Sequence, residues 1–557
     1  MTALLTAHLP LLAGAPNGIK KLRELILELA VRGKLVPQNS NDKPMEPLLN
    51  ASRIARAKAM AEGKIKKEKA AAEIVFEEQS FKLPNGWAWC RVVDTGDYIN
   101  GLAFKPSDWS GSGRPIIRIQ NLSGRNSEFN RTDREVDASV VVNEGDILVS
   151  WSATLEAYVW SGEQGVLNQH IFRVSPSELV FDQYLFWLLK WTIRVLANSD
   201  HAHGLVMAHI NRGPFLAQAV GLPPLEEQER IVAKVVELMA LCDRLEAQQA
   251  DTESAHTRLV QALLESLTQA SDATDFADSW QRLSEHFHTL FTTESSIDIL
   301  KQTLLQLAVV GKLVPQDSSD EPVSKLLVRL NKERERLEVE GLCKKVKALD
   351  PLHEDEKPCK LPASWEWVRL GTICSKVTDG EHATPRRSSS GHYLLSARNV
   401  TNEGILLGDV DFVPPDEFER IRKRCDPNIG DVLISCSGSV GRVALVDRDN
   451  AYVMVRSAAM VRPISIGLSP EFIAQCLRSP IMQAEMVSKS RKSAQANLFL
   501  GAISSLVIPV APQAEQHRIV AKVNQLMALC DRLKARLTQA RQLNEQLAST
   551  LVEQAVA

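Results

Sequence analysis

The chain contains two copies of one plan. LAVRGKLVPQNSNDKP begins at Leu29 and returns as LAVVGKLVPQDSSDEP at Leu307, and KLPNGWAW returns as KLPASWEW, both at an offset of 278 residues. QERIVAKVVELMALCDRLEA from Gln228 returns as QHRIVAKVNQLMALCDRLKA from Gln516, at an offset of 288. Such a repeat constrains the fold more than any single motif, because each copy specifies the same local structure. The 557 residues therefore predict a duplicated architecture with more than one hydrophobic core.

Some segments of the two copies are very similar, whereas others are not. GDILVS from Gly145 and GDVLIS from Gly430 still correspond, but residues 95–220 and 375–505 otherwise share little. Two similar frames thus carry two dissimilar inserts. A duplication whose inserts drifted without purpose would leave this pattern, but inserts that bind different ligands explain it better.

Each copy ends in a long predicted helix, at about residues 226–270 and from residue 513 to the C-terminus. Apolar residues recur at alternating spacings of four and three, which is typical of a coiled coil. The seam positions are Ile231, Val235, Leu238, Cys242 and Leu245 in the first helix, and Ile519, Val523, Leu526, Cys530, Leu533, Leu537, Ala540, Asn544, Leu547 and Leu551 in the second. We interpret Cys242 and Cys530 as small core residues. Asn544 would either fix the register or lie at an exposed helix end.

Shorter helices are predicted in both copies by apolar periodicity, charge pattern and stop signals. They cover residues 19–31, 53–69 and 182–196 in the first copy and 297–310, 329–347 and 470–487 in the second. Short β-branched runs separated by Gly, Asn and Asp fill the rest of both inserts and indicate strands. The inserts are therefore expected to be mixed α and β domains.

The composition excludes several classes of protein. With 44% hydrophobic and 24% charged residues, the chain has the balance of a folded protein, and no apolar run approaches the roughly 18 residues that cross a membrane. The nine cysteines contain no Cys-x-x-Cys pair, so reduced thiols and a cytoplasmic location are expected. His201, His203 and His209 have no carboxylate or cysteine at matching ligand spacing, so no metal site is expected.

Several phrases, occurring twice in the same order, resemble the specificity subunits of type I restriction-modification systems. LPNGWAWCRV and LPASWEWVRL open the inserts, GDILVSWSA and GDVLISCSGSVGRVALV lie within them, LNQHIFRV follows from Leu167, and LPPLEEQERIV and IPVAPQAEQHRIV close them. The second closing phrase departs from the first, with Val510-Ala511-Pro512 where the first has Pro224-Leu225. The resemblance covers essentially the whole chain.

The resemblance implies an α+β fold in which two mixed α/β target-recognition domains, in a pseudo-two-fold arrangement, are carried by two long antiparallel coiled-coil helices. The implied domains are an N-terminal helical region at 1–83, the first target-recognition domain at 84–225, a central region at 226–360, the second target-recognition domain at 361–512 and a C-terminal helix at 513–557.

The resemblance also implies a subunit that binds double-stranded DNA and has no catalytic activity of its own. Each insert would read one half of a bipartite site, while the helices would set the spacer and bind two modification subunits and, in a restriction complex, two motor-nuclease subunits. S-adenosylmethionine, ATP and Mg would be held by those partners. The sequence is consistent with this division, since it lacks a G-x-x-x-x-G-K-[ST] loop, an H-E-x-x-H motif, a G-x-G-x-x-G fingerprint and the Asn- or Asp-Pro-Pro-aromatic motif of adenine methyltransferases.

Candidate DNA contacts follow from side-chain chemistry, because Arg, Lys, Asn, Gln and His supply the groups that meet base edges and phosphates. In the first insert these are Arg114, Arg118, Gln120, Asn121, Arg125, Arg131, Gln169 and His170. In the second they are His382, Arg386, Arg387, Arg398, Asn399, Arg422, Lys423, Arg424, Lys489, Arg491 and Lys492.

The charge balance of the inserts bears on how tightly they hold DNA. Residues 84–225 contain 11 Lys and Arg against 14 Asp and Glu, and residues 361–512 contain 17 against 15, so the net charges are −3 and +2. Because phosphate neutralisation dominates affinity for DNA, the isolated chain is expected to bind it weakly. Two alternatives remain open: a self-sufficient DNA methyltransferase or nuclease, and a coiled-coil scaffold whose inserts bind proteins.

Overall fold

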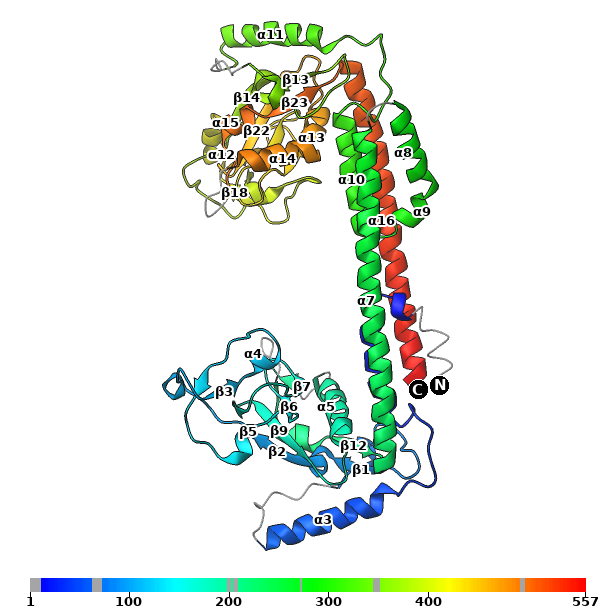
Figure 1. Cartoon of the computed structure of the whole chain (residues 1–557). Coiled ribbons are helices and arrows are strands. Elements are labelled where there is room, and N and C mark those ends of the chain that lie inside the picture. Colours follow the sequence, from blue (N-terminus) through cyan, green and yellow to red (C-terminus); the bar gives the residue numbers. More distant parts are fainter. Residues whose placement is uncertain are drawn as a thin grey trace. The chain divides into compact units, whose positions relative to one another are not determined.

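The structure, a computed structural model, falls into two units that follow the duplication (Figure 1). Unit 1 contains residues 1–252 and 540–557, and unit 2 contains residues 253–539. Helices α7 (Leu225–Gln269) and α16 (Gln513–Val556) contribute to both units. The described residues are 12–62, 73–197, 202–203, 209–270, 273–343, 351–490 and 496–556. Within these ranges, no helix combines the length and the hydropathy that a membrane span requires.

Unit 1 carries a mixed α and β insert on a helical frame. Its own helices are α2 (Gly18–Val31), α3 (Met45–Ala61), α4 (Ile119–Leu122), α5 (Asp182–Ala197) and α6 (Arg212–Ala217). Its strands are β1 (Ala88–Arg91), β2 (Gly96–Asn100), β3 (Arg114–Ile117), β4 (Arg131–Thr132), β5 (Val141–Val142), β6 (Ile147–Ser150), β7 (Glu156–Val159), β8 (Gly165–Leu167), β9 (Ile171–Pro176), β10 (Ala202–His203), β11 (His209–Ile210) and β12 (Ala219–Leu222). They form an antiparallel sheet of order β2-β9-β6-β7, a sheet of order β4-β3-β8-β5 with β3 and β8 parallel, and the antiparallel pairs β1-β12 and β10-β11.

Unit 2 repeats this plan. Its helices are α8 (Ala273–Glu285), α9 (Phe287–Leu290), α10 (Glu294–Val309), α11 (Val323–Val339), α12 (Pro415–Arg422), α13 (Pro470–Arg478), α14 (Pro480–Lys489) and α15 (Leu500–Ser504). Its strands are β13 (Glu366–Arg369), β14 (Cys374–Asp379), β15 (His392–Leu395), β16 (Val400–Thr401), β17 (Gly404–Ile405), β18 (Asp411–Val413), β19 (Val432–Ser435), β20 (Val443–Leu445), β21 (Tyr452–Met454), β22 (Ala458–Pro463) and β23 (Val507–Val510). The sheet β14-β22-β19-β20 corresponds to β2-β9-β6-β7, and the sheet β18-β15-β21, with β15 and β21 parallel, corresponds to β4-β3-β8.

The first and last strands of each insert pair with each other, and the main sheet of the insert packs against helices. In unit 1, β1 pairs with β12, and Phe172 of β9 shares a core with Tyr184 of α5 and Val235 of α7. In unit 2, β13 pairs with β23, and Ile434 of β19 shares a core with Phe472 of α13. Complete burial of such side chains stabilises the fold by about 1.5–3 kcal/mol each. The alternation of buried β-branched residues with turn signals thus correctly predicted mixed α and β domains.

A buried glutamate joins each long helix to its insert. In unit 1, Glu227 at the start of α7 is 1% exposed and accepts hydrogen bonds from Trp87 Nε1 at 3.0 Å and from Gln38 Nε2 at 2.8 Å. In unit 2, Glu515 at the start of α16 is also 1% exposed and accepts from Trp365 Nε1 at 2.9 Å and from Gln316 Nε2 at 2.5 Å. Burial raises the pKa of both carboxyls above its usual value, and these hydrogen bonds partly oppose that rise. The same side chains therefore make the same joint in both units.

The two long helices pair through their apolar seams in each unit. In unit 1, Val235 and Cys242 of α7 share a core with Ala548 and Ala555 of α16. In unit 2, Val260 and Leu264 of α7 share a core with Cys530 of α16. The first part of α7 thus packs with the last part of α16 and the reverse, so the helices are antiparallel as predicted. Cys242 and Cys530 are 0% and 5% exposed, which confirms their interpretation as core residues.

The predicted seam of α16 is wrong at Ala540, Asn544 and Leu547, whereas Leu551 packs against the core of unit 1 as predicted. Asn544 is exposed and Leu547 is 46% exposed, whereas Ala548 is fully buried. From the partly buried Leu537 to Ala548 is eleven residues, and an 11-residue step of three turns matches a straight helix better than a continued heptad does. The buried face of α16 therefore shifts by one residue relative to the predicted heptad, because the helix keeps its natural number of residues per turn.

Three other helix predictions need correction. The helix expected at 470–487 is two helices, α13 and α14, because Pro480 cannot continue the hydrogen bonding of α13 and begins a new helix. The charged helices begin earlier than predicted, at Met45 and Val323, and residues 63–72 and 344–350, which contain their predicted ends, lie outside the described residues. Helix α8 was not predicted from the sequence.

Candidate nucleic-acid interface

The main sheet of each unit has one edge where the chain leaves the strands in loops. In unit 1, β2 and β6 end beside the start of β9, since Asn100 pairs with Phe172 and Ser150 pairs with Ile171. In unit 2, β14 and β19 end beside the start of β22, since Asp379 pairs with Ala459 and Ser435 pairs with Ala458. We call this place the strand-end edge. It occupies the same position in both units, so its residues can be compared directly.

One glycine in each unit brings the backbones together at this edge. A Cβ atom on Gly101 would lie 2.0 Å from the carbonyl oxygen of Asn168, and one on Gly380 would lie 2.2 Å from that of Met454. No other residue fits here without moving the chain. The two glycines therefore keep the strand-end loops of both units in one geometry.

The strand-end edge of unit 1 is built from Asn100, Trp151 and His170. Trp151 Nε1 donates to Asn100 Oδ1 at 3.3 Å, and the Trp151 ring meets the His170 ring edge to face, with centroids 4.6 Å apart. His170 has φ of 70° and Ala153 has φ of 59°, conformations that are strained for residues other than glycine. His170 Nδ1 is buried and has no partner among the described residues. Strain and an unpaired polar atom together make this edge a candidate functional surface.

The strand-end edge of unit 2 carries different groups at the same position. The carboxylate of Asp379, which corresponds to Asn100, lies 2.7 Å from His382 Nε2 and accepts from Arg424 Nη2 at 2.5 Å. Burial alone would favour the neutral acid, but the hydrogen bonds from Arg424 and His382 outweigh it and hold the pKa of Asp379 below its usual value. Asp379 is therefore charged and holds two exposed cationic or polar groups at the edge.

The other predicted arginines of unit 2 are mostly paired with acids. Arg386 pairs with Asp416, and Arg387 and Arg398 both lie near Asp411, with N–O distances of 3.4 and 3.0 Å. These pairs are largely solvent-exposed, so their contribution to stability is small and DNA phosphates can compete for the arginines. The charge of this surface is partly neutralised by the protein itself.

Three remaining predicted residues of unit 2 lie apart from these pairs. Arg422 donates to Asn450 Oδ1 at 2.9 Å and to Asn428 Oδ1 at 3.2 Å, which ties two loops together. Lys423 is exposed, and Lys489 Nζ donates to the carbonyl of Ser505 at 3.1 Å. Arg491 and Lys492 lie outside the described residues.

The predicted residues of unit 1 are spread over the insert. Arg118 lies over the ring of Trp109, with its guanidinium carbon 4.7 Å from the ring centroid, and Arg131 pairs with Glu163 at 2.5 Å. Arg114 is half-buried at the start of β3. Gln120, Arg125 and Gln169 are exposed. Only Gln169 and His170 adjoin the strand-end edge.

Asn121 and Asn399 have a structural role that the sequence reasoning missed. Asn121 Oδ1 accepts from the amide of Arg118 at 3.1 Å, and its Nδ2 donates to the carbonyl of Glu128 at 2.8 Å. Asn399 repeats both contacts, with the amide of Ser396 at 2.9 Å and the carbonyl of Asp409 at 3.0 Å, and is 2% exposed. Their side chains are used within the protein, so we leave both out of the proposed interface. Asn121 and Asn399 are 278 residues apart, which is the offset of the repeat, and this correspondence between the two copies could have revealed their structural role.

No pattern in the sequence pointed to Asn100, Trp151 and Asp379, which form the centre of the strand-end edges. Asp379 and Arg424 are 45 residues apart, and Trp151 and Asn100 are 51 apart, so spacing alone could not join them. Near the edge of unit 2, Ser435 Oγ donates to the carbonyl of Ser439 in a turn that contains Gly438 and Gly441.

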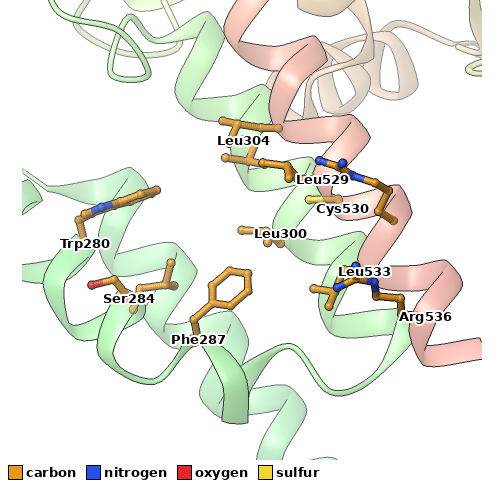
Figure 2. Close-up of a pocket in the computed structure, with 12 residues that line it drawn as sticks. Trp280, Ser284, Phe287, Leu300, Leu304, Leu529, Cys530, Leu533 and Arg536 are labelled. Atoms are coloured by element: carbon orange, nitrogen blue, oxygen red, sulfur yellow. The ribbon is translucent and has the colours of Figure 1, made fainter. Parts of the chain in front are cut away.

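A separate apolar groove of about 570 Å³ lies within unit 2, between α8, α9, α10 and α16. Figure 2 shows Trp280 and Phe287 on one side of it and Leu529, Cys530 and Leu533 of α16 on the other. Trp280 is 42% and Leu529 45% exposed. The groove is lined by Trp280, Leu283, Ser284, Phe287, Leu300, Leu304, Leu526, Leu529, Cys530, Arg532, Leu533 and Arg536.

Together the two units define a duplicated binding protein, with one frame presenting two different surfaces. Residues 84–252 and 362–541 match the family described as the type I restriction modification DNA specificity domain. The chain is 34% identical to the specificity subunit of the type I restriction enzyme EcoAI and 32% identical to that of EcoEI, both from Escherichia coli, and each match covers 97% of this chain and 94% of the relative. A solved chain from a study of complex assembly and conformational transition of the type I R-M system overlaps 86% of this chain and 99% of its own length, with a TM-score of 0.49 and 17% identity. The chain belongs to the type I restriction-modification specificity subunits.

Proposed function

We propose that this chain is the DNA-recognition subunit of a type I restriction-modification complex, in which each insert reads one half of a bipartite site. The observation that carries this proposal is the contrast at the strand-end edge. One sheet position presents Asn100, Trp151 and His170 in unit 1 but Asp379, His382 and Arg424 in unit 2. Frames that agree while their exposed polar edges differ are suited to reading two different base sequences.

Exchange of one insert tests this proposal. Residues 84–225 are replaced by the corresponding insert of the EcoAI relative, and methylated adenines are mapped in DNA from cells that carry the chain with its modification subunits. We expect one half of the methylated sequence to change while the other half and the spacer stay the same. An unchanged site, or methylation that ignores sequence in the unaltered complex, would contradict the proposal.

We further propose that α7 and α16 set the spacer. A helix of 45 residues is about 65 Å long at a rise of about 1.5 Å per residue, whereas same-face major grooves recur about every 34 Å. Helices of this length can hold two readers one turn of DNA apart. The rival scaffold function requires instead that DNA modification in the full complex be independent of sequence.

We propose that partner subunits carry out the catalytic reactions of the system. The proposed complex contains two modification subunits, which hold S-adenosylmethionine, and two restriction subunits, which use ATP and Mg, all on cytoplasmic DNA. The paired arginines and the weak net charges of the inserts favour tight DNA binding only in this complex. Binding of S-adenosylmethionine by the purified chain would instead support a self-sufficient methyltransferase.

The groove of unit 2 is the proposed docking site for an amphipathic helix of a modification subunit. Its apolar floor fits the hydrophobic face of a helix. The exposed side chains of Arg532 and Arg536 have no ion-pair partner among the described residues, so they suit a helix flanked by carboxylates.

Substitution of Leu529 tests this docking site. In Leu529→Glu we expect the affinity for the modification subunit to fall at least about tenfold, because a charge would be buried against the docked helix. Ala528→Glu, at an exposed neighbouring position that does not line the groove, is the control. Binding is measured by calorimetry and folding by thermal denaturation. Equal affinities of the two variants would exclude the groove as the docking site.

A further inference from the structure

We infer that Asp379 is a positioning residue that determines which base pair Arg424 reads in the second half-site. This inference rests on the proposed function and adds a residue for which the sequence suggested no role. Asp379 ends β14, its side chain is 15% exposed, and its carboxylate faces both His382 and Arg424.

Arg424 is exposed enough to contact DNA, and its guanidinium group is held in one direction. Arg424 Nη2 donates to Asp379 Oδ1 at 2.5 Å and lies 3.0 Å from His382 Nε2, while the side chain is 45% exposed. Nε and Nη1 of the guanidinium have no hydrogen-bond partner among the described residues. Guanine presents two acceptors in the major groove, O6 and N7, that suit a fixed guanidinium. A guanine is therefore the expected base.

The contrast with the neighbouring pair Arg386–Asp416 supports a specific role for Asp379. Both members of that pair are exposed, at 61% and 71%, so their contact does not fix the arginine in one direction. Asp379 is instead anchored in the strand ladder, two residues before Glu381, which pairs with Arg420. A carboxylate on a rigid strand positions its arginine more accurately than one on an exposed turn.

In unit 1 the same sheet position is occupied by Asn100, which accepts from Trp151 rather than from an arginine. A neutral amide cannot hold a guanidinium by a charge-assisted hydrogen bond as a carboxylate does. The residue at this sheet position, which would hold the side chain that reads DNA, therefore differs between the two units. This difference predicts that the effect of changing Asp379 is confined to one half-site.

The test uses Asp379→Asn in the full complex with its modification subunits. Methylation rates are measured on duplexes that carry the mapped site and on duplexes with each single base pair changed. We expect discrimination at one G·C pair of the second half-site to fall about tenfold, while discrimination throughout the first half-site and the melting temperature stay the same. Asp416→Asn is the matched control and should leave every position unchanged. Equal discrimination by Asp379→Asn and the unaltered chain would overturn the inference.

A double substitution separates positioning from general structural support. Arg424→Gln should lose discrimination at the same base pair, and adding Asp379→Asn to it should cause no further loss, because both residues act through one contact. Additive losses, or losses at different base pairs, would show that Asp379 does not act through Arg424. If insert exchange changes the half-site but these variants do not, the inference fails alone; if insert exchange has no effect, the proposed function fails.

Discussion

Gly380→Ala is expected to destabilise unit 2 by about 3 kcal/mol and to abolish recognition of the second half-site. The new Cβ would lie 2.2 Å from the carbonyl oxygen of Met454 and 2.3 Å from its carbonyl carbon. Both atoms belong to the backbone of β21, so no side-chain rotation can relieve the clash. The loop that carries His382 and the strand that carries Asp379 must move apart from their neighbours.

Gly408→Ala is the matched control for this prediction. A Cβ at Gly408 has no atom within 4 Å, so its effect on stability should stay within about 0.5 kcal/mol. Thermal denaturation of the full chain and methylation of the mapped site measure the two consequences. If Gly380→Ala melts with the unaltered chain and methylates the same site, the close backbone approach does not hold the edge together.

Glu515→Ala is expected to destabilise unit 2 by about 3 kcal/mol. The substitution removes the acceptor for Trp365 Nε1 and for Gln316 Nε2 in an environment where Glu515 itself is 1% exposed. The buried Trp365 Nε1, left without a partner, costs about 1–3 kcal/mol, whereas the exposed Gln316 still donates to the carbonyl of Gly311. Since this joint connects α16 to the insert, we also expect the second half-site to be read less accurately.

Two further variants define the cause of this effect. Glu515→Gln keeps one acceptor, and we expect it to cost about 1 kcal/mol. Because burial raises the pKa of Glu515, the folded state binds a proton more readily than the unfolded state, and the unaltered chain should lose stability relative to Glu515→Gln as the pH rises through that pKa. Gln525→Ala, at an exposed position of α16, controls for helix propensity. Chemical denaturation with urea measures all three, and equal values for Glu515→Ala and Gln525→Ala would rule out a structural joint at Glu515.

The repeat and the periodicity were enough to predict the frame. Both long helices begin within one residue of their predicted starts, since their apolar spacing reports a local property of the helix. The Trp–Glu joints could not be predicted in the same way, because Trp87 and Glu227 are 140 residues apart and Trp365 and Glu515 are 150 apart. The paired strands β1-β12 and β13-β23 bring those segments together.

The candidate site was predictable only in part. Side-chain chemistry drew attention to His170, His382 and Arg424, which lie at the strand-end edges, but it treated Asn121 and Asn399 in the same way, although both close turns. Chemistry alone cannot distinguish an amide that faces DNA from one that satisfies a backbone carbonyl. That distinction depends on where the side chain points after folding.

The sequence by itself determined that the chain is duplicated, where its two long helices lie, and which parts of the two copies differ, because these properties are read from the residues of each segment. The tertiary structure alone decided which of the differing residues meet. Antiparallel pairing of β14, β22 and β19 places loops that are distant in the sequence at one edge, where Asp379, His382 and Arg424 come within hydrogen-bond distance. Contacts of this kind depend on which distant segments pair as strands, and the periodicity within one strand does not specify that pairing.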